Sequence, residues 1–360
     1  MWASLVGQER AAQRLERAAA RPSHAYLIIG SRGAGSVVAA RALAAALLDA
    51  ALPESVVGRV QRGRHPDVVE FEPEGLTYKI GEEVREGIIA EANRSPIESD
   101  RKVVLVLDAE RLRNDAQNAL LKTIEEPPAR TVMVLVAEAS DDLLPTVRSR
   151  CQRIDLDTIP EETVRVELER NGADPERAAV AARLAGGRLD RAQSLVDGSA
   201  ARVRDAFVVA TTRANGTGGM AVQLTDDLVG ALDEGVAEVE AAQAREVAEL
   251  DEEIERAQYP TRTAQAMRTR LGQRQKREQR RARTDLLVEG LAAMESRYRD
   301  ALVGDPALAL NQDRELLMLD PAAAARGIEA CAGARRALYR NPNERLLLDR
   351  LLIGVPAGRR

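Results

Sequence analysis

Aromatic residues, cysteines and histidines are scarce in this sequence, and each scarcity excludes a class of protein. Aromatic residues make up 2% of the 360 residues. Aliphatic side chains must therefore fill the interior, which favours helices and buried parallel strands. The two cysteines, Cys151 and Cys331, cannot form a four-cysteine zinc site and do not indicate a secreted disulfide framework. His24 and His65 are the only histidines, so we expect no histidine-rich centre and no bound metal.

The overall charge and hydropathy exclude two further classes. The formal net charge is −5, which argues against a chain that coats nucleic acid unaided but leaves room for a local basic patch. No uncharged apolar run reaches the ~20 residues that a membrane helix needs. Glu9 and Arg10 lie too close to the start for a signal peptide. We expect a cytoplasmic protein with two or three domains.

Short apolar runs alternate with amphipathic segments in the first part of the chain. The runs that predict strands are 25–30, 68–71, 102–108, 131–138 and 152–156. The segments that predict helices are 7–20, 37–48, 82–93 and 114–126. Residues 52–66 are expected to be irregular. This alternation predicts an α/β fold with a doubly wound parallel sheet, followed by successive helices after Pro160.

A glycine-containing turn between the first strand and its helix has part of a phosphate-binding loop. Such a loop needs glycines, then a lysine for the outer phosphates and a Ser or Thr for magnesium. Gly30, Gly33 and Gly35 stand at suitable places, but Ser36 occupies the lysine position and Val37 the Ser/Thr position. The turn is therefore either a degenerate phosphate loop or an ordinary strand-to-helix connection.

The second half of an ATPase site is also incomplete. Asp108 ends an apolar strand, but Ala109 follows where a catalytic glutamate is needed, and Glu110 comes one residue late. Asp108 can equally be an acidic residue at a helix N-terminus without a metal. Both motifs have lost residues that the chemistry requires, so we expect no ATP hydrolysis.

A segment from Asn118 to Cys151 carries several linked motifs. It reads NALLK, then EEPP, an apolar strand, and SRC. In their order and spacing, these motifs closely resemble the AAA+ clamp-loader subunits of bacterial DNA polymerase III. HAYLIIG at 24–30, HPDVVEFEPEG at 65–75 and VGQ at 6–8 extend the resemblance over about residues 5–156. A weaker resemblance returns near the end, in RRALYRNPNERLLLDRLLI.

The resemblance assigns a role to the SRC motif, which is Ser149, Arg150 and Cys151. In the family this arginine reaches across a subunit boundary and stabilises charge on a neighbour's ATP. Carried over, that role falls on Arg150, whose guanidinium is permanently charged and suits phosphate. The alternative is that Arg150 pairs with an acidic residue such as Asp155. Cys151 is expected to be a small packed residue rather than a nucleophile.

The chain departs from the family pattern at two further places. The family's module of four cysteines would precede His65, but residues 51–64 contain none, so zinc is not expected. The family's sensor arginine aligns with Asp190, beside Arg191. We expect no cofactor of this chain's own, with ATP held by partner subunits, although weak nucleotide binding is not excluded.

The resemblance implies three domains and a set of partners. The domains are an AAA+ nucleotide-binding-fold domain (1–158), a helical lid (159–205) and a helical collar (206–360). The implied partners are the gamma/tau and delta subunits, with the sliding clamp and primer-template DNA reached through the complex. Because this sequence lacks key nucleotide-site residues, it resembles family members that have lost their nucleotide site more than it resembles the gamma/tau ATPases. The alternatives are a working gamma/tau-type ATPase and an AAA+-fold adaptor outside replication.

The collar contains a segment of opposite charges at about 233–283. Residues 233–256 hold ten acidic and two basic side chains, and residues 262–283 hold nine basic and one acidic. The two stretches predict an antiparallel helical hairpin. It is either a solvated, partly mobile arm or a surface for DNA phosphates or an acidic partner. The basic candidates are Arg268, Arg270, Arg274, Lys276, Arg277, Arg280, Arg281 and Arg283.

Overall fold

The computed structural model describes residue 2 and residues 5–48, 54–73, 77–259, 261–338 and 342–356, with the backbone alone at positions 32, 54, 55, 197 and 277. The chain forms two compact units. The first comprises Met1–Glu167 and Gly187–Asp190, and the second Leu168–Gly186 and Arg191–Arg360. The three-domain division at 158 and 205 stays a prediction.

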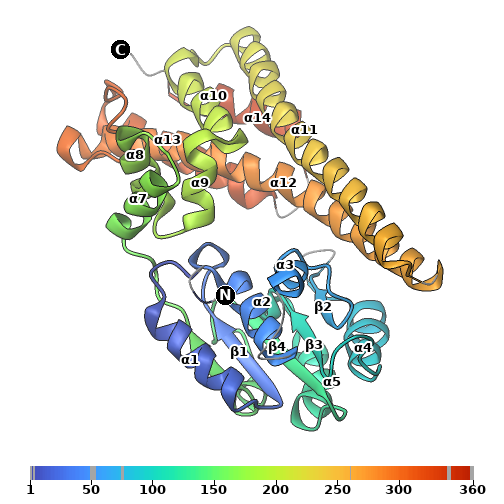
Figure 1. The fold of residues 1–360 in the computed structure, drawn as a ribbon. Helices are drawn as coiled ribbons and strands as arrows, with labels where there is room; N and C mark the ends of the chain where they lie inside the picture. The colour runs from blue at the N-terminus through green and yellow to red at the C-terminus, as the bar shows by residue number, and fades with distance from the viewer. Residues whose placement is uncertain are drawn as a thin grey trace. The chain divides into compact units, whose positions relative to one another are not determined.

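A five-stranded parallel sheet forms the centre of the first unit (Figure 1). Its strand order is β2-β3-β4-β1-β5. The strands are β1 (Ala25–Ile29), β2 (Val68–Phe71), β3 (Lys102–Val106), β4 (Thr131–Ala137) and β5 (Gln152–Asp155). The expected α/β class with a parallel sheet is thus confirmed.

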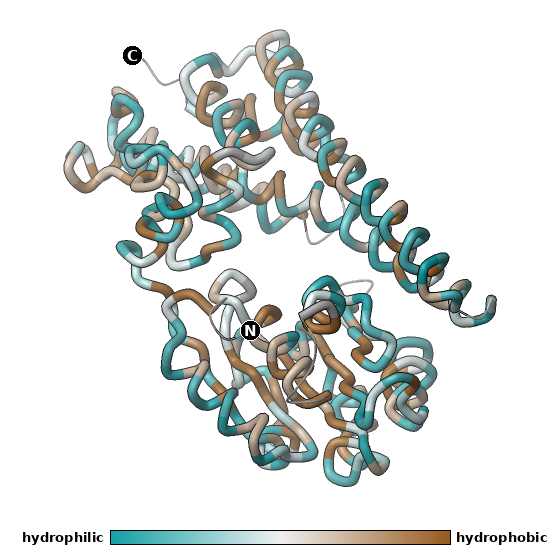
Figure 2. Tube along the Cα trace, viewed as in Figure 1, coloured by the Kyte–Doolittle hydropathy of each residue, from teal (hydrophilic) through white to brown (hydrophobic). Residues whose placement is uncertain are grey.

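Both faces of this sheet are buried, because its strands are almost continuously apolar and helices cover each side. Tyr26 and Ile28 point to one face with α1 (Glu9–Ala20) and α2 (Ser36–Leu48). Leu27 points to the other face with α5 (Asn114–Glu125). Figure 2 shows the strands as the most hydrophobic traces of this unit. The buried strands fix the loops at their two ends.

Two local expectations in this unit differ from the structure. Residues 52–66 are not irregular throughout, since α3 (Glu54–Gln61) packs against α2. This helix is too short for its periodicity to stand out in the sequence. The helix expected at 82–93 is the π-helix η3 (Ile80–Ile89), followed by the short helix α4 (Ala90–Ala92). Gly81 and Gly87 lie within η3 and weaken the preference for regular α-helical turns.

The second unit is helical, as expected after Pro160. Apart from short 3-10 turns, the helices from α7 onward are α7 (Glu161–Arg170), α8 (Pro175–Ala185), α9 (Leu189–Asp197), α10 (Ser199–Arg213), α11 (Gly218–Ala257), α12 (Thr261–Val303), α13 (Pro321–Leu338) and α14 (Glu344–Gly354). The predicted hairpin is formed by the long helices α11 and α12, which run side by side (Figure 1). In the part of the chain that the structure describes, no helix is long and apolar enough to cross a membrane.

Close helix packing in the second unit depends on glycine at particular positions. A Cβ added to Gly327 in α13 would lie 2.5 Å from the ring of Tyr298, a fully buried residue of α12. A Cβ added to Gly333 in the same helix meets no atom closer than 4.0 Å. The two glycines form a matched pair for testing this contact.

We expect Gly327→Ala to lower the free energy of unfolding by about 1–3 kcal/mol, because the extra methyl group overpacks the interface with Tyr298. Gly333→Ala should be neutral or stabilise by up to about 1 kcal/mol, because alanine favours an unobstructed helix. Urea unfolding followed by circular dichroism measures both. Equal effects of the two substitutions would contradict the packing.

Candidate functional site

The glycine-containing turn lies at the carboxyl edge of the sheet, where open α/β folds bind ligands. It connects β1 to α2 through the 3-10 turn η2 (Arg32–Ala34). Gln8, which is buried, holds it in place. The Gln8 amide donates to the carbonyl oxygens of Ala34 at 3.3 Å and Asp157 at 2.6 Å, and its oxygen accepts from Asp157 N. The VGQ motif thus ties the turn to the end of β5.

The packing or the backbone conformation requires glycine at each of these three positions of the turn. A Cβ on Gly30 would lie 2.8 Å from Cβ of Leu156, and Gly35 has a φ of +93°. Gly33 packs directly under Arg188 and Asp190, since an added Cβ would lie 2.4 Å and 2.2 Å from their atoms. The side chains of Arg188 and Asp190 therefore lie directly against the backbone of the turn at Gly33.

The residues that follow the glycines provide neither a cation nor a magnesium ligand. Ser36 begins α2 and is 1% exposed, and its hydroxyl has no hydrogen-bond partner among the described residues. Val37 is half-buried and packs against the core. The helix N-terminus favours an anion, but positions 36 and 37 lack the lysine and the hydroxyl that hold a triphosphate and its magnesium.

Carboxylates gather at the ends of β3 and β4, beside the turn. Asp108 is 5% exposed, has the left-handed φ of +51°, and lies 3.7 Å from Nε of Arg111. Glu110 accepts a hydrogen bond from Glu138 N at 3.3 Å. Burial raises the pKa of Glu110, and the charges of Asp108 and Glu138 raise it further. No group of three acidic, histidine or cysteine side chains in the described ranges could hold a metal ion.

Arg191, the arginine beside the sensor position Asp190, pairs within the second unit. Arg191 forms a bidentate ion pair with Glu289 of α12, at 2.6 and 2.8 Å. Arg188 donates to Asp190 at 3.3 Å. Among the described side chains, Arg188 is a cation that lies against Gly33, and local sequence pattern does not relate these two positions because they are over 150 residues apart in the chain.

Arg150 lies on the surface of the first unit, between α6 (Pro145–Arg148) and β5. Its side chain is 34% exposed. Its guanidinium lies against Glu125 at the end of α5, with Nε 3.2 Å and Nη2 3.3 Å from the carboxylate oxygens, and it donates to Thr146 O at 3.0 Å. The alternative expectation, that Arg150 pairs with an acidic residue, is thus confirmed in this structure, but the partner is Glu125 rather than Asp155, which pairs with Arg153 at 2.7 Å.

The register of the sheet separates Arg150 from the glycine-containing turn of its own chain. Gln152 in β5 is level with Tyr26 in β1, so Arg150 precedes β5 at the amino edge of the sheet. The turn follows β1 at the opposite edge. Six residues separate the level of His24 from Gly30, which is about 20 Å along a strand. Arg150 therefore cannot reach its own turn, and any phosphate it binds must come from elsewhere.

The neighbours of Arg150 have packing roles. Ser149 Oγ donates to Thr146 O at 3.2 Å, which supports the turn before β5. Burial raises the pKa of Cys151 to about 12, so its thiol stays protonated at neutral pH. His65 is buried, and its Nδ1 accepts from Asp67 N at 3.1 Å. Val68 N donates to His65 O at 3.1 Å, so His65 begins the turn that leads into β2.

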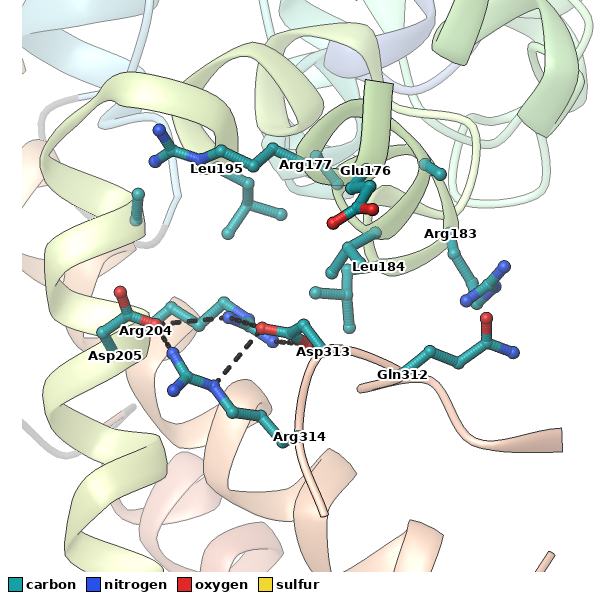
Figure 3. Close-up of a pocket in the computed structure, with 14 residues that line it drawn as sticks. Glu176, Arg177, Arg183, Leu184, Leu195, Arg204, Asp205, Gln312, Asp313 and Arg314 are labelled. Carbon is teal, nitrogen blue, oxygen red and sulfur yellow. Dashed lines mark hydrogen bonds and ion pairs between the residues drawn. The ribbon is translucent and has the colours of Figure 1, made fainter. Parts of the chain in front are cut away.

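The second unit contains a pocket of about 550 Å³ between α8, α10 and the segment 312–314 (Figure 3). Buried Arg204 forms a bidentate pair with Asp313, at 2.9 and 3.2 Å. Arg314 pairs with Asp205 at 2.8 Å and with Asp313 at 3.3 Å. Figure 3 shows Asp313 between the two guanidiniums. These ion pairs attach the segment to α10.

Comparison with known proteins agrees with the geometry of the first unit. Residues 7–160 match the family model described as "DNA polymerase III, delta subunit". The chain is 32% identical to subunit delta' of Bacillus subtilis over 170 residues, or 46% of this chain and 51% of that protein. It is 35% identical to subunit delta' of Escherichia coli over 147 residues, covering 41% and 44%. It is 32% identical to subunit gamma/tau of Mycobacterium tuberculosis over 248 residues, covering 64% and 42%.

By these matches the chain is a relative of the clamp-loader subunits of DNA polymerase III. More particularly, it is a relative of the delta' subunits. The chain spans about half the length of the curated relatives it matches.

We expect this chain alone to show no magnesium-dependent ATP binding of micromolar affinity, which corresponds to about −8 kcal/mol. The reason is the absence of a lysine at Ser36 and of a metal ligand at Val37, together with the cover over Gly33. Isothermal titration calorimetry with and without magnesium measures this. A micromolar, magnesium-dependent dissociation constant would instead favour a gamma/tau-type ATPase.

Proposed function

We propose that this chain is a delta'-type, non-hydrolysing subunit of a cytoplasmic clamp loader of bacterial DNA polymerase III, and that it supplies Arg150 to ATP bound by a neighbouring subunit. The neighbours are gamma/tau and delta in a five-subunit ring. The ring uses ATP to open the sliding clamp and place it on primer-template DNA. This chain contributes a guanidinium and a rigid fold rather than an ATPase site of its own.

The observation that carries the proposal is the position of Arg150 at the sheet edge opposite its own incomplete loop. Glu125 is 55% exposed, so its pair with Arg150 is a surface ion pair, worth about 0.2–1 kcal/mol. That small energy lets the guanidinium exchange a carboxylate for a phosphate. A bidentate contact with a partly enclosed phosphate is stronger than the pair it replaces. Glu125 thus keeps Arg150 oriented until a neighbour's nucleotide arrives.

Two other functions fit parts of the chain less well. A gamma/tau-type ATPase needs the lysine and the metal ligand that Ser36 and Val37 replace. An adaptor outside replication needs no arginine at the SRC position. Co-purification with gamma/tau and delta distinguishes this adaptor from a clamp-loader subunit, because an unrelated adaptor does not join the ring.

We expect Arg150→Ala to reduce ATP turnover at the site that this chain completes by more than about 100-fold, since arginine fingers contribute roughly 10³–10⁵ in rate. Clamp loading by the reconstituted ring should fall with it. The ring itself should still assemble, because Arg150 is only partly buried and makes only a weak pair. Turnover is measured by phosphate release, and assembly by size-exclusion chromatography.

Arg153→Ala is the matched control for this experiment. Arg153 lies three residues further on, at the start of β5, and its side chain is 50% exposed and paired with Asp155. The substitution Arg153→Ala also removes one positive charge from this part of the surface, and it should leave ATP turnover unchanged. Normal turnover with Arg150→Ala, or equal losses for both variants, would count against the assignment.

A further inference from the structure

The helical hairpin formed by α11 and α12 has a fixed inner side. Gln243 and Gln275 exchange hydrogen bonds with each other's backbone carbonyls at 3.2 and 3.1 Å. Towards the tip, an apolar cluster contains Leu250, Ile254, Ala264 and Leu271. These contacts determine which face of α12 meets α11 and which face is turned away.

Several basic residues of α12 are neutralised by acidic residues. Arg268 pairs with Asp251 of α11 at 2.8 Å, and Arg274 pairs with Glu246 of the same helix. Arg283 pairs with Asp233 at 2.6 Å and with Glu344 at 2.8 Å. The hairpin is thus an internally packed element, and these three arginines are engaged in holding it together.

Other basic residues of α12 remain exposed on the outer face. Arg262, Lys276 and Arg280 are exposed and form no ion pair among the described residues. Thr269 and Gln273 are exposed between them. At 3.6 residues per turn these five positions fall within a sector of about 60° and extend over about 27 Å. We call them the basic stripe.

The basic stripe lies opposite the acidic side of the hairpin. Glu278 is the one acidic residue in 262–283, and it accepts a hydrogen bond from Gln243 of α11, on the inner side. The acidic side chains of α11 are about one helix diameter away, roughly 10 Å. This distance is about the Debye length at 0.1 M salt, so salt partly screens their repulsion of a ligand on the stripe.

The composition of the stripe restricts the kind of partner. A protein interface needs apolar or aromatic anchors, but the exposed large apolar residues of α12 begin only at Val288. Single-stranded nucleic acid needs aromatic side chains for stacking, and the stripe has none. A row of cations with glutamine and threonine matches the regular phosphate charges and hydrogen-bond acceptors of a duplex backbone.

We propose that the basic stripe of α12 binds the phosphate backbone of duplex DNA without regard to sequence. The choice of DNA as the polyanion rests on the proposed clamp-loader function. The contact itself concerns a different surface from Arg150, and the isolated chain can test it without ring assembly. Because the other side of the hairpin is acidic, we expect DNA to contact the hairpin only through the basic stripe.

The test is fluorescence anisotropy of a labelled 30-base-pair duplex of random sequence with the full chain, at about 50–200 mM salt. We expect salt-dependent binding of the wild-type chain. The triple variant Arg262→Gln, Lys276→Gln, Arg280→Gln should bind at least about tenfold more weakly at 100 mM salt. It should also lower the slope of log affinity against log salt by about 2–3, because each phosphate contact contributes about 0.9.

The charge-matched control is Arg326→Gln, Arg336→Gln, Arg350→Gln, which removes three exposed arginines from α13 and α14. It should keep the wild-type slope. The proposal is overturned if the wild-type chain does not bind duplex, if the stripe variant keeps the wild-type slope, or if the control loses as much. A normal ring assembled with the stripe variant, together with its reduced DNA binding, supports both proposals. DNA binding through the stripe by a chain that fails to join gamma/tau and delta overturns only the clamp-loader proposal.

Discussion

The common direction of the five strands is the constraint on which the functional organisation depends. In a parallel sheet, every strand-to-helix connection lies at one edge and every entry into a strand lies at the other. The glycine-containing turn and the carboxylates Asp108, Glu110 and Glu138 share the first edge, and Arg150 lies at the second. No side-chain movement brings these two groups together, so each must act, if at all, with a different molecule.

The edge with the glycine-containing turn is closely packed. Its glycines allow Leu156, Arg188 and Asp190 to approach the backbone, and Gln8 attaches the turn to the chain after β5. A missing lysine alone leaves a loop that an unrelated cation could complete. Here Arg188 and Asp190 lie against Gly33, and the carboxylates Asp108, Glu110 and Glu138 lie at the ends of the neighbouring strands. At the opposite edge, the half-buried guanidinium of Arg150 has a surface ion pair with Glu125, which is the arrangement that the proposed exchange of partners requires.

The strands were predicted best from the sequence where every residue of the strand is buried. The runs at 25–30, 102–108 and 131–138 became β1, β3 and β4 because both faces of each strand are covered. The hairpin followed from its separated charges and helix-forming residues. The helix α3 was not predicted, and the π-helix η3 was predicted as an ordinary helix with other bounds. Short and glycine-containing segments carry a weak periodic signal. The contact of Arg188 with Gly33 and the pairing of Arg150 with Glu125 join distant positions that local pattern does not relate.

The most direct measurement of the central claim is a cryo-electron microscopy structure of the assembled ring with an ATP transition-state analogue. We predict the Arg150 guanidinium at about 2.7–2.9 Å from the terminal phosphate group of a neighbouring subunit's nucleotide, with its pair to Glu125 opened. An Arg150 side chain that still pairs with Glu125, away from every subunit boundary, would contradict the account.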